Sequence, residues 1–364
     1  MPLIFHIGNA LVNFVVMDLI FRELPMPTLQ IQYGRTLRLA IAHRFITLSV
    51  PFAERRLIRM KTPEILLLGN GLNNAFDGTA WNTLIHKMAR RKDLPERIDL
   101  PYPLQIMLAT CGDYAQSLQG MQDALVGVQP QGEFRYLLHR LMNMGFDDIL
   151  TTNYSYEMER VSFPKELDSA KTRSRVRRMQ ATTAERAEPR YMLHTFNRTV
   201  ENRIWHIHGE ARKPQSMIIG HYEYASLLSR MKAHSDERRD AYQHLEEEPL
   251  NKLSWVDQFI LGNVYVLGFG FDPSEMDLWW LLNRKQNERA EHGQVYFYEP
   301  RQETPFNARV ELLKVMGVEV CNLGVTLSKD QAERNRQYKE FYSMAIEEIE
   351  KRTQEGTKNG GLSD

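Results

Sequence analysis

The stretch EILLLGNGLN at residues 64–73 joins a short apolar run to a turn that contains two glycines. An apolar run of this length, ended by glycine, is typical of a buried parallel strand. Gly69 and Gly71 allow a sharp turn with exposed backbone N–H groups, which together with a following helix can bind a pyrophosphate. The fingerprint is incomplete, because Asn74 stands where a dinucleotide-binding motif has its third glycine. Glycines in such turns also serve packing, so the stretch alone leaves cofactor binding open.

Other apolar runs share this character and are separated by helical patterns. We expect strands at residues 64–68, 148–151, 203–207, 216–219, 263–267, 294–298 and 318–322. Helical spacing of apolar residues is found at 79–91, 134–144, 273–282 and 307–316. Alternation of strands and helices indicates parallel strands with crossover helices. The sequence therefore predicts an α/β fold, a Rossmann-like doubly wound parallel sheet with an inserted helical subdomain.

The chain also predicts a division into segments. Residues 1–59 combine an interrupted apolar stretch with an arginine-rich segment, and they are either mis-started upstream sequence before Met60 or a helical arm. Residues 60–324 are expected to form the nucleotide-binding domain, with helical insertions at 92–130 and 222–258. Residues 325–364 are expected to form a charged helix at 329–352 and a disordered tail from residue 356.

The composition excludes several classes of protein. Hydrophobic residues make up 43% of the 364 residues, which argues against a disordered chain. The 46 basic residues balance 46 acidic ones, so direct nucleic-acid binding is not expected. We interpret the arginine-rich stretch at 160–200 as a solvent-exposed linker rather than as a polyanion-binding patch.

Membrane, secretion and metal signals are weak. Polar residues interrupt the first apolar stretch, and no basic residue precedes it, so we expect no membrane span and a cytoplasmic location. Cys111 and Cys321 are the only cysteines, and a zinc site made of four cysteines cannot be built from them. The sequence therefore predicts no metal and no zinc.

Two polar motifs end predicted strands. Thr152, Asn153 and Tyr154 follow one of them, and an asparagine there can hold ribose hydroxyls or a water, although it can also simply cap the strand. His206 and His208 point to the same side of another strand, but two histidines alone make a poor zinc site. His208 precedes a glycine turn and suits general-base work at neutral pH, whereas His206 is expected to be structural.

A second glycine pair and a carboxylate complete the candidate site. Gly268, Phe269 and Gly270 follow the strand at 263–267 and precede a helical pattern, so their backbone could contact ribose or phosphate. Glu299 ends the strand at 294–298, where a carboxylate can accept hydrogen bonds from a ribose diol.

The order of these motifs is more specific than any one of them. Over residues 60–324 the chain resembles the sirtuin-like NAD-binding family, in particular the bacterial sirtuin-like NADase domains of anti-phage defence. The resemblance implies that Asn153 and His208 are catalytic. It implies that the NAD-binding residues are Gly69, Asn70, Gly71, Leu72, Asn73, Thr152, Tyr154, Gly268, Phe269, Gly270 and Glu299. It also places Trp81, Glu159, Ser216 and Tyr224 nearby.

This resemblance implies an NAD+ hydrolase that releases nicotinamide and ADP-ribose, with NAD as the substrate. Related domains act under restraint, so we expect a homo-oligomer or a regulatory partner such as a HerA-like ATPase. A non-catalytic sensor of NAD or ADP-ribose is the main alternative, and an NAD-dependent protein deacylase is disfavoured because its zinc module is missing. Ser155 departs from the family pattern, where an aspartate often helps to position nicotinamide.

Overall fold

The structure, a computed structural model, describes residues 62–76, 78, 80–95, 98–162, 193–199, 202–238, 254–288, 293–302 and 306–359. The chain divides into two units, Met1–Arg59 and Met60–Asp364. The first unit lies outside the described residues, and so does most of the arginine-rich stretch at 160–200. The expectations for these segments therefore stay predictions.

A seven-stranded sheet forms the centre of the second unit. Its strands are β1 (Glu64–Leu68), β2 (Asp148–Thr151), β3 (Asn197–Arg198), β4 (Arg203–His206), β5 (Asn263–Leu267), β6 (Val295–Tyr298) and β8 (Glu319–Cys321). Their spatial order is β3-β4-β2-β1-β5-β6-β8, and all neighbours are parallel except β3 and β4. The chain moves from β1 toward β4 and then crosses to β5 on the other side of β1. The predicted Rossmann-like sheet is confirmed, with its topological switch point between β1 and β5.

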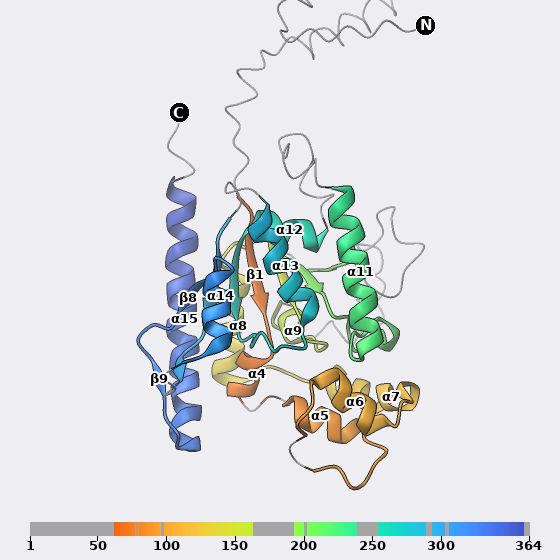
Figure 1. Ribbon diagram of the computed structural model, residues 1–364. Coiled ribbons are helices and arrows are strands. Elements are labelled where there is room, and N and C mark those ends of the chain that lie inside the picture. Colours follow the sequence, from red (N-terminus) through yellow and green to blue (C-terminus); the bar gives the residue numbers. More distant parts are fainter. Residues whose placement is uncertain are drawn as a thin grey trace, which may run out of the picture. The chain divides into compact units, whose positions relative to one another are not determined.

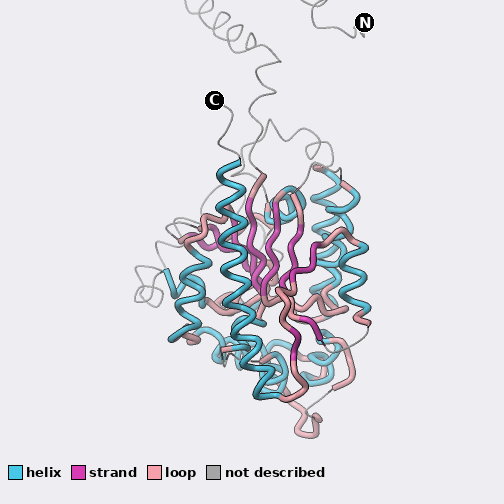
Figure 2. Tube along the Cα trace, turned by 90° about the vertical axis from the view of Figure 1, so that its left-hand side faces the viewer, coloured by secondary structure: helices cyan, strands magenta, loops and turns pink. Residues whose placement is uncertain are grey.

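Helices cover both faces of this sheet, as its alternating side chains require (Figures 1 and 2). Leu66 and Leu68 pack with α8 (Gly132–Met142), α9 (Glu157–Ser162) and α15 (Gln331–Asn359). Ile65 and Leu67 belong to the opposite cluster. The helices that contribute to it are α11 (His221–Glu237), α12 (Trp255–Leu261), α13 (Met276–Asn287) and α14 (Ala308–Val315). Burial on both faces explains why β1 is continuously apolar.

Of the described helices between β1 and β2, four lie near the carboxyl ends of the strands. They are α4 (Gly71–Ala75), α5 (Trp81–Met88), α6 (Tyr102–Thr110) and α7 (Tyr114–Val126). Figure 1 shows α5, α6 and α7 beyond the end of β1, next to α4. A separate apolar cluster joins α5, α6 and α7 to Tyr154 and Met217. They therefore form one wall above the edge of the sheet where ligands of open α/β folds bind.

The structure differs from the sequence prediction in two places. The strand predicted at 216–219 is wrong: the short helix η1 (Pro214–Ser216) leads into a segment that belongs to no strand of either sheet. Its apolar residues are buried because they fill core clusters, and the Ile218 carbonyl accepts a hydrogen bond from Tyr154 instead of a strand. Helix α15 also extends further than predicted, to Asn359. Residues 239–253 of the second predicted insertion lie outside the described residues.

Two short strands, β7 (Arg301–Gln302) and β9 (Thr326–Leu327), pair separately beside the main sheet. Among the helices that the structure describes, none combines the length and the apolar character that crossing a membrane requires.

Candidate active site

A cavity of about 830 Å³ opens at the carboxyl ends of β1 and β5. Most residues predicted for the site line it: Asn70, Gly71, Asn73, Thr152, Asn153, Tyr154, His208, Gly268, Phe269, Gly270 and Glu299. Gly69 and Leu72 do not. Leu72 is fully buried in the core, and a Cβ at Gly69 would lie 2.5 Å from the carbonyl oxygen of Gly268. Both serve packing beneath the cavity in this structure.

The two glycine turns are joined to each other. The Gly71 amide donates a hydrogen bond of 2.6 Å to the carbonyl oxygen of Gly268. Gly268 has φ +67°, a left-handed conformation that favours glycine. The Gly71 N–H group, which the sequence suggested for a diphosphate, is therefore occupied by another part of the protein.

Asn153 is held firmly from its backbone. Its N–H group donates to the Thr151 hydroxyl oxygen over 3.1 Å, and that hydroxyl donates to the Leu68 carbonyl oxygen. A ring nitrogen of His206 lies 2.7 Å from the Asn153 carbonyl oxygen. Asn153 thereby lines the cavity, two residues after the end of β2.

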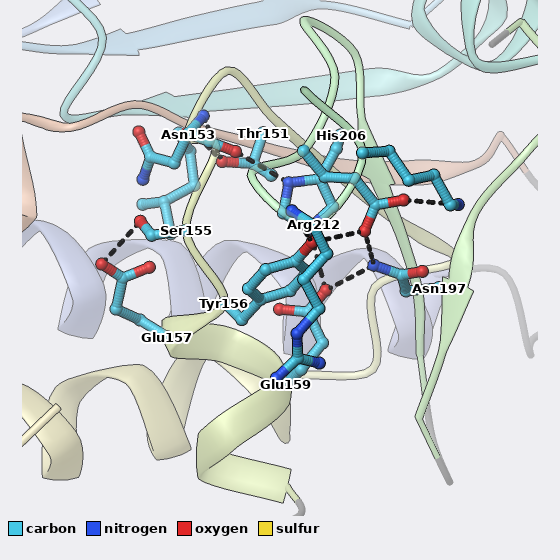
Figure 3. A network of polar contacts seen from close by, with 12 residues as sticks. Thr151, Asn153, Ser155, Tyr156, Glu157, Glu159, Asn197, His206 and Arg212 are labelled. Carbon is cyan, nitrogen blue, oxygen red and sulfur yellow. Dashed lines mark hydrogen bonds and ion pairs between the residues drawn. The ribbon is translucent and has the colours of Figure 1, made fainter. Parts of the chain in front are cut away.

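His206 belongs to a buried network behind Asn153 (Figure 3). Its Nε2 atom lies 2.9 Å from the Glu159 carboxylate, which also accepts a hydrogen bond from Asn197. Burial lowers the pKa of His206, but the Glu159 and Glu210 carboxylates and the Asn153 carbonyl together outweigh it and raise the pKa to about 9. A charged His206 can donate to both Glu159 and the Asn153 carbonyl. It lies outside the cavity lining, in keeping with a structural role.

His208 occupies the cavity wall just after β4, and both of its ring nitrogens face carboxylates. Nε2 lies 2.8 Å from Asp277 Oδ2, and Nδ1 lies 3.8 Å from Glu275 Oε2. The Tyr224 ring meets the imidazole edge to face at 5.3 Å. Burial lowers the pKa of His208, but Asp277 and Glu275 together outweigh it, so the pKa is raised.

The two carboxylates beside His208 were missed by the sequence analysis. Glu275 lines the cavity and accepts a hydrogen bond of 2.9 Å from the Tyr224 hydroxyl. Burial raises the pKa of Glu275 although His208 opposes the shift. The available signal was a pair of acidic residues two positions apart where α13 begins. Only the fold shows that they face a histidine about seventy residues earlier.

A third carboxylate lies under Asn73. Glu157 lines the cavity and accepts hydrogen bonds from the Ser155 hydroxyl (2.7 Å) and the Asn73 amide (3.0 Å). Burial raises the pKa of Glu157, and the Ser155 hydrogen bond partly opposes this. Glu157, in the first turn of α9, therefore supplies a carboxylate next to Ser155, the position where the family pattern has an aspartate.

The opposite end of the cavity has acidic and aromatic walls. Arg309 of α14 pairs with Glu299 and also donates to the carbonyl oxygen of Gly270. Tyr338 and Tyr342 of α15 line the same end, with ring centroids 6.2 Å apart. Among the described residues, the second oxygen of Glu299 has no hydrogen-bond partner. This end therefore combines a buried carboxylate oxygen that has no partner within the described part of the chain with an aromatic surface that lines the cavity.

The other residues that the resemblance placed nearby divide into two groups. Trp81 and Tyr224 line the cavity. Glu159 instead pairs with His206, and the Ser216 hydroxyl donates to the Lys213 carbonyl. The latter two thus support the loops behind the site.

Within the described residues, one group could bring enough ligand atoms together for a cation. Atoms of His208, Glu275 and Asp277 lie within 4.8 Å of one another. The short distance between His208 and Asp277 is that of a hydrogen bond. This hydrogen bond explains why the two side chains lie together without an ion between them. The prediction of no metal remains untested by the structure.

The fold and this cavity define a Rossmann-like protein with a nucleotide-sized site at its switch point. Residues 147–321 match the model of the SIR2-like domain family. The match supports a sirtuin-like family, whose members are generally NAD-dependent enzymes, and it implies NAD binding. No curated protein matches the chain.

Proposed function

We propose that this protein is an NAD+ glycohydrolase that cleaves NAD into nicotinamide and ADP-ribose. One observation supports this most directly: the Asn153 amide and the His208 imidazole face the same cavity as both glycine turns and Glu299. The cavity thus joins polar groups suited to the chemistry with groups suited to a dinucleotide.

The chemistry requires little acid catalysis. The nicotinamide of NAD is positively charged, so it leaves as a neutral molecule when its bond to ribose breaks. The site must instead hold the ribose and stabilise an oxocarbenium-like centre while water attacks. In the proposal, Asn153 holds the ribose hydroxyls and the water, and His208 accepts the proton of the water.

The remainder of the cavity would bind the other half of NAD. Glu299 would accept hydrogen bonds from the adenosine ribose, as acidic residues at strand ends do in dinucleotide-binding folds. The diphosphate would lie along the joined glycine turns. Since Gly71 already donates to Gly268, NAD would either displace that bond or use neighbouring amides.

For the biological role we propose an anti-phage effector that depletes NAD in an infected cell. The support is the motif order of residues 60–324, which resembles such domains. The same resemblance suggests control by homo-oligomer formation or by a regulatory protein such as a HerA-like ATPase. We further propose that it acts in the cytoplasm, where NAD is available.

The test is to incubate purified protein with NAD and to measure nicotinamide and ADP-ribose by chromatography, with and without candidate activators. Asn153→Ala and His208→Ala should each lower nicotinamide release at least about a hundredfold while remaining folded. Asn143→Ala and His86→Ala are matched controls, because both side chains are exposed and lie outside the cavity.

Three outcomes separate the alternatives. Wild-type rates in the Asn153 or His208 variant would refute their roles. Tight NAD or ADP-ribose binding without turnover under any condition would favour the sensor. Release of nicotinamide only with an acylated peptide would favour the deacylase.

A further inference from the structure

Asp277 is an unusual partner for His208. It lies in the first turn of α13, is fully buried, and places Oδ2 2.8 Å from His208 Nε2. Its other oxygen has no hydrogen-bond partner among the described residues. A buried carboxylate with so few donors depends strongly on the one hydrogen bond it receives.

This hydrogen bond determines which ring nitrogen can accept a proton. An ionised carboxylate only accepts hydrogen bonds, so Nε2 of His208 must carry a hydrogen. In the neutral imidazole, the lone pair is then on Nδ1. The relation is that of a histidine oriented by a buried aspartate in hydrolytic triads.

The free nitrogen faces Glu275. Nδ1 lies 3.8 Å from Glu275 Oε2, a separation that lets a proton pass after a small movement or through one water. Glu275 retains 15% of its side-chain surface exposed, whereas Asp277 retains none. Glu275 is thus the member of the cluster with access to the cavity and to solvent.

Other groups around the cluster are mostly hydroxyls and carboxylates. Tyr224 donates to Glu275, and the Tyr154 hydroxyl donates to the Ile218 carbonyl instead. The nearby carboxylates Asp272 and Glu223 add negative charge to this environment. A proton that arrives on His208 or Glu275 is therefore stabilised electrostatically.

We propose that Asp277, His208 and Glu275 form a proton relay in which Asp277 orients His208 and Glu275 carries the proton out of the site. This inference rests on the proposed NAD hydrolysis. Water oxygen bonds to the ribose C1′ as the C1′–nicotinamide bond breaks, and the bonding electrons leave with neutral nicotinamide. The water proton moves to Nδ1 of His208, then to the Glu275 carboxylate, and finally to solvent. Asp277 is a positioning residue.

Asp277→Asn tests the positioning role. The amide nitrogen of asparagine can donate to Nε2, which would move the ring hydrogen of His208 to Nδ1 and leave it unable to accept a proton. We expect kcat to fall at least about a hundredfold with KM changed less than about threefold. Asp236→Asn, at an exposed aspartate of α11, is the matched control and should keep wild-type kinetics.

A measurement without catalysis tests the same role. ¹⁵N NMR of histidine-labelled protein distinguishes the two ring nitrogens, with the His208 signal assigned by its absence in His208→Ala. We expect neutral His208 to carry its hydrogen on Nε2 in the wild type and on Nδ1 in Asp277→Asn. This measurement remains possible in wild type if Asp277→Asn fails to fold.

Glu275→Gln tests the exit of the proton. We expect a loss of kcat of at least about tenfold and a changed pH profile, with the His208 hydrogen still on Nε2. The relay would be overturned if wild-type His208 carried its hydrogen on Nδ1. It would also be overturned if folded Asp277→Asn or Glu275→Gln kept the full kcat. Wild-type protein that never releases nicotinamide would instead overturn the proposed function, while the NMR result would still decide the orientation of His208.

Discussion

Gly71 and Gly268 lie on opposite sides of the switch point, and one hydrogen bond of 2.6 Å joins their backbones. The contact is possible because neither residue has a side chain. A Cβ at Gly71 would lie 2.6 Å from the Tyr342 hydroxyl and 2.7 Å from the Gly268 carbonyl oxygen. These glycines therefore bring the turn after β1, the turn after β5 and helix α15 together beneath the cavity.

Gly71→Ala should destabilise the protein, because the added methyl group must displace backbone or the end of Tyr342. We expect a loss of about 1–3 kcal/mol in the free energy of unfolding, measured by urea denaturation. Gly120→Ala in α7 is the control, since its nearest neighbour atom would be 3.5 Å away and alanine favours a helix. Equal stability of the Gly71 variant and wild type would contradict the tight contact.

His206 should make stability depend on pH. Its pKa rises from 6.5 in the unfolded chain to about 9 in the folded protein. The stabilisation is therefore complete below about pH 6.5 and is lost as the pH rises toward 9. His206→Gln should remove this part of the pH dependence. Unfolding free energies at several pH values check this, and identical slopes in both proteins would argue against a charged His206.

Ser155→Asp would introduce the aspartate of the family pattern that the sequence resembles, yet we expect it to destabilise this protein. Position 155 is buried, and its side chain contacts Glu157, so the change would place two carboxylates together. The expected loss is about 2 kcal/mol at neutral pH, and it should shrink at lower pH as one carboxyl becomes protonated. Ser229→Asp, on the exposed surface of α11, should have little effect. A more stable Ser155→Asp variant would disprove this reasoning.

Tyr338→Leu should weaken binding of the adenine end of NAD. Tyr338 lines the cavity next to Glu299, and an aromatic surface there can stack on a base. We expect about tenfold weaker binding of ADP-ribose in calorimetry, whereas nicotinamide mononucleotide, which lacks adenine, should bind as to wild type. Tyr136→Leu, at an exposed tyrosine of α8, is the control. An equal loss for both ligands would place adenine elsewhere.

The sequence predicted the sheet well because its strands are continuous apolar runs ended by polar or glycine turns. Glu64–Leu68 and Asn263–Leu267 appear with the predicted bounds. The run at 216–219 was wrongly predicted to be a strand, because its apolar residues can be buried without a strand partner. A short apolar run has the same pattern in a buried loop.

The sequence predicted those residues of the candidate site that belong to a motif at the end of a strand, such as Asn153 and His208. Glu275 and Asp277 were not predicted because their partner, His208, follows β4, far from them in the sequence, and no local pattern encodes that contact. The cavity residues of α15 were not predicted for a related reason. Tyr338 and Tyr342 look like a core stripe in the sequence, and only tertiary packing shows that they also line the cavity.

Helix α15 follows every strand that the structure describes, yet its Tyr342 packs against the first glycine turn. During translation, the ribosome releases residues 64–73 long before it releases residues 331–359. A nascent chain that already contains Asn153 and His208 still lacks one wall of the nucleotide cavity. The order of synthesis thus delays assembly of the complete cavity until the seven strands of the main sheet and α15 have been made.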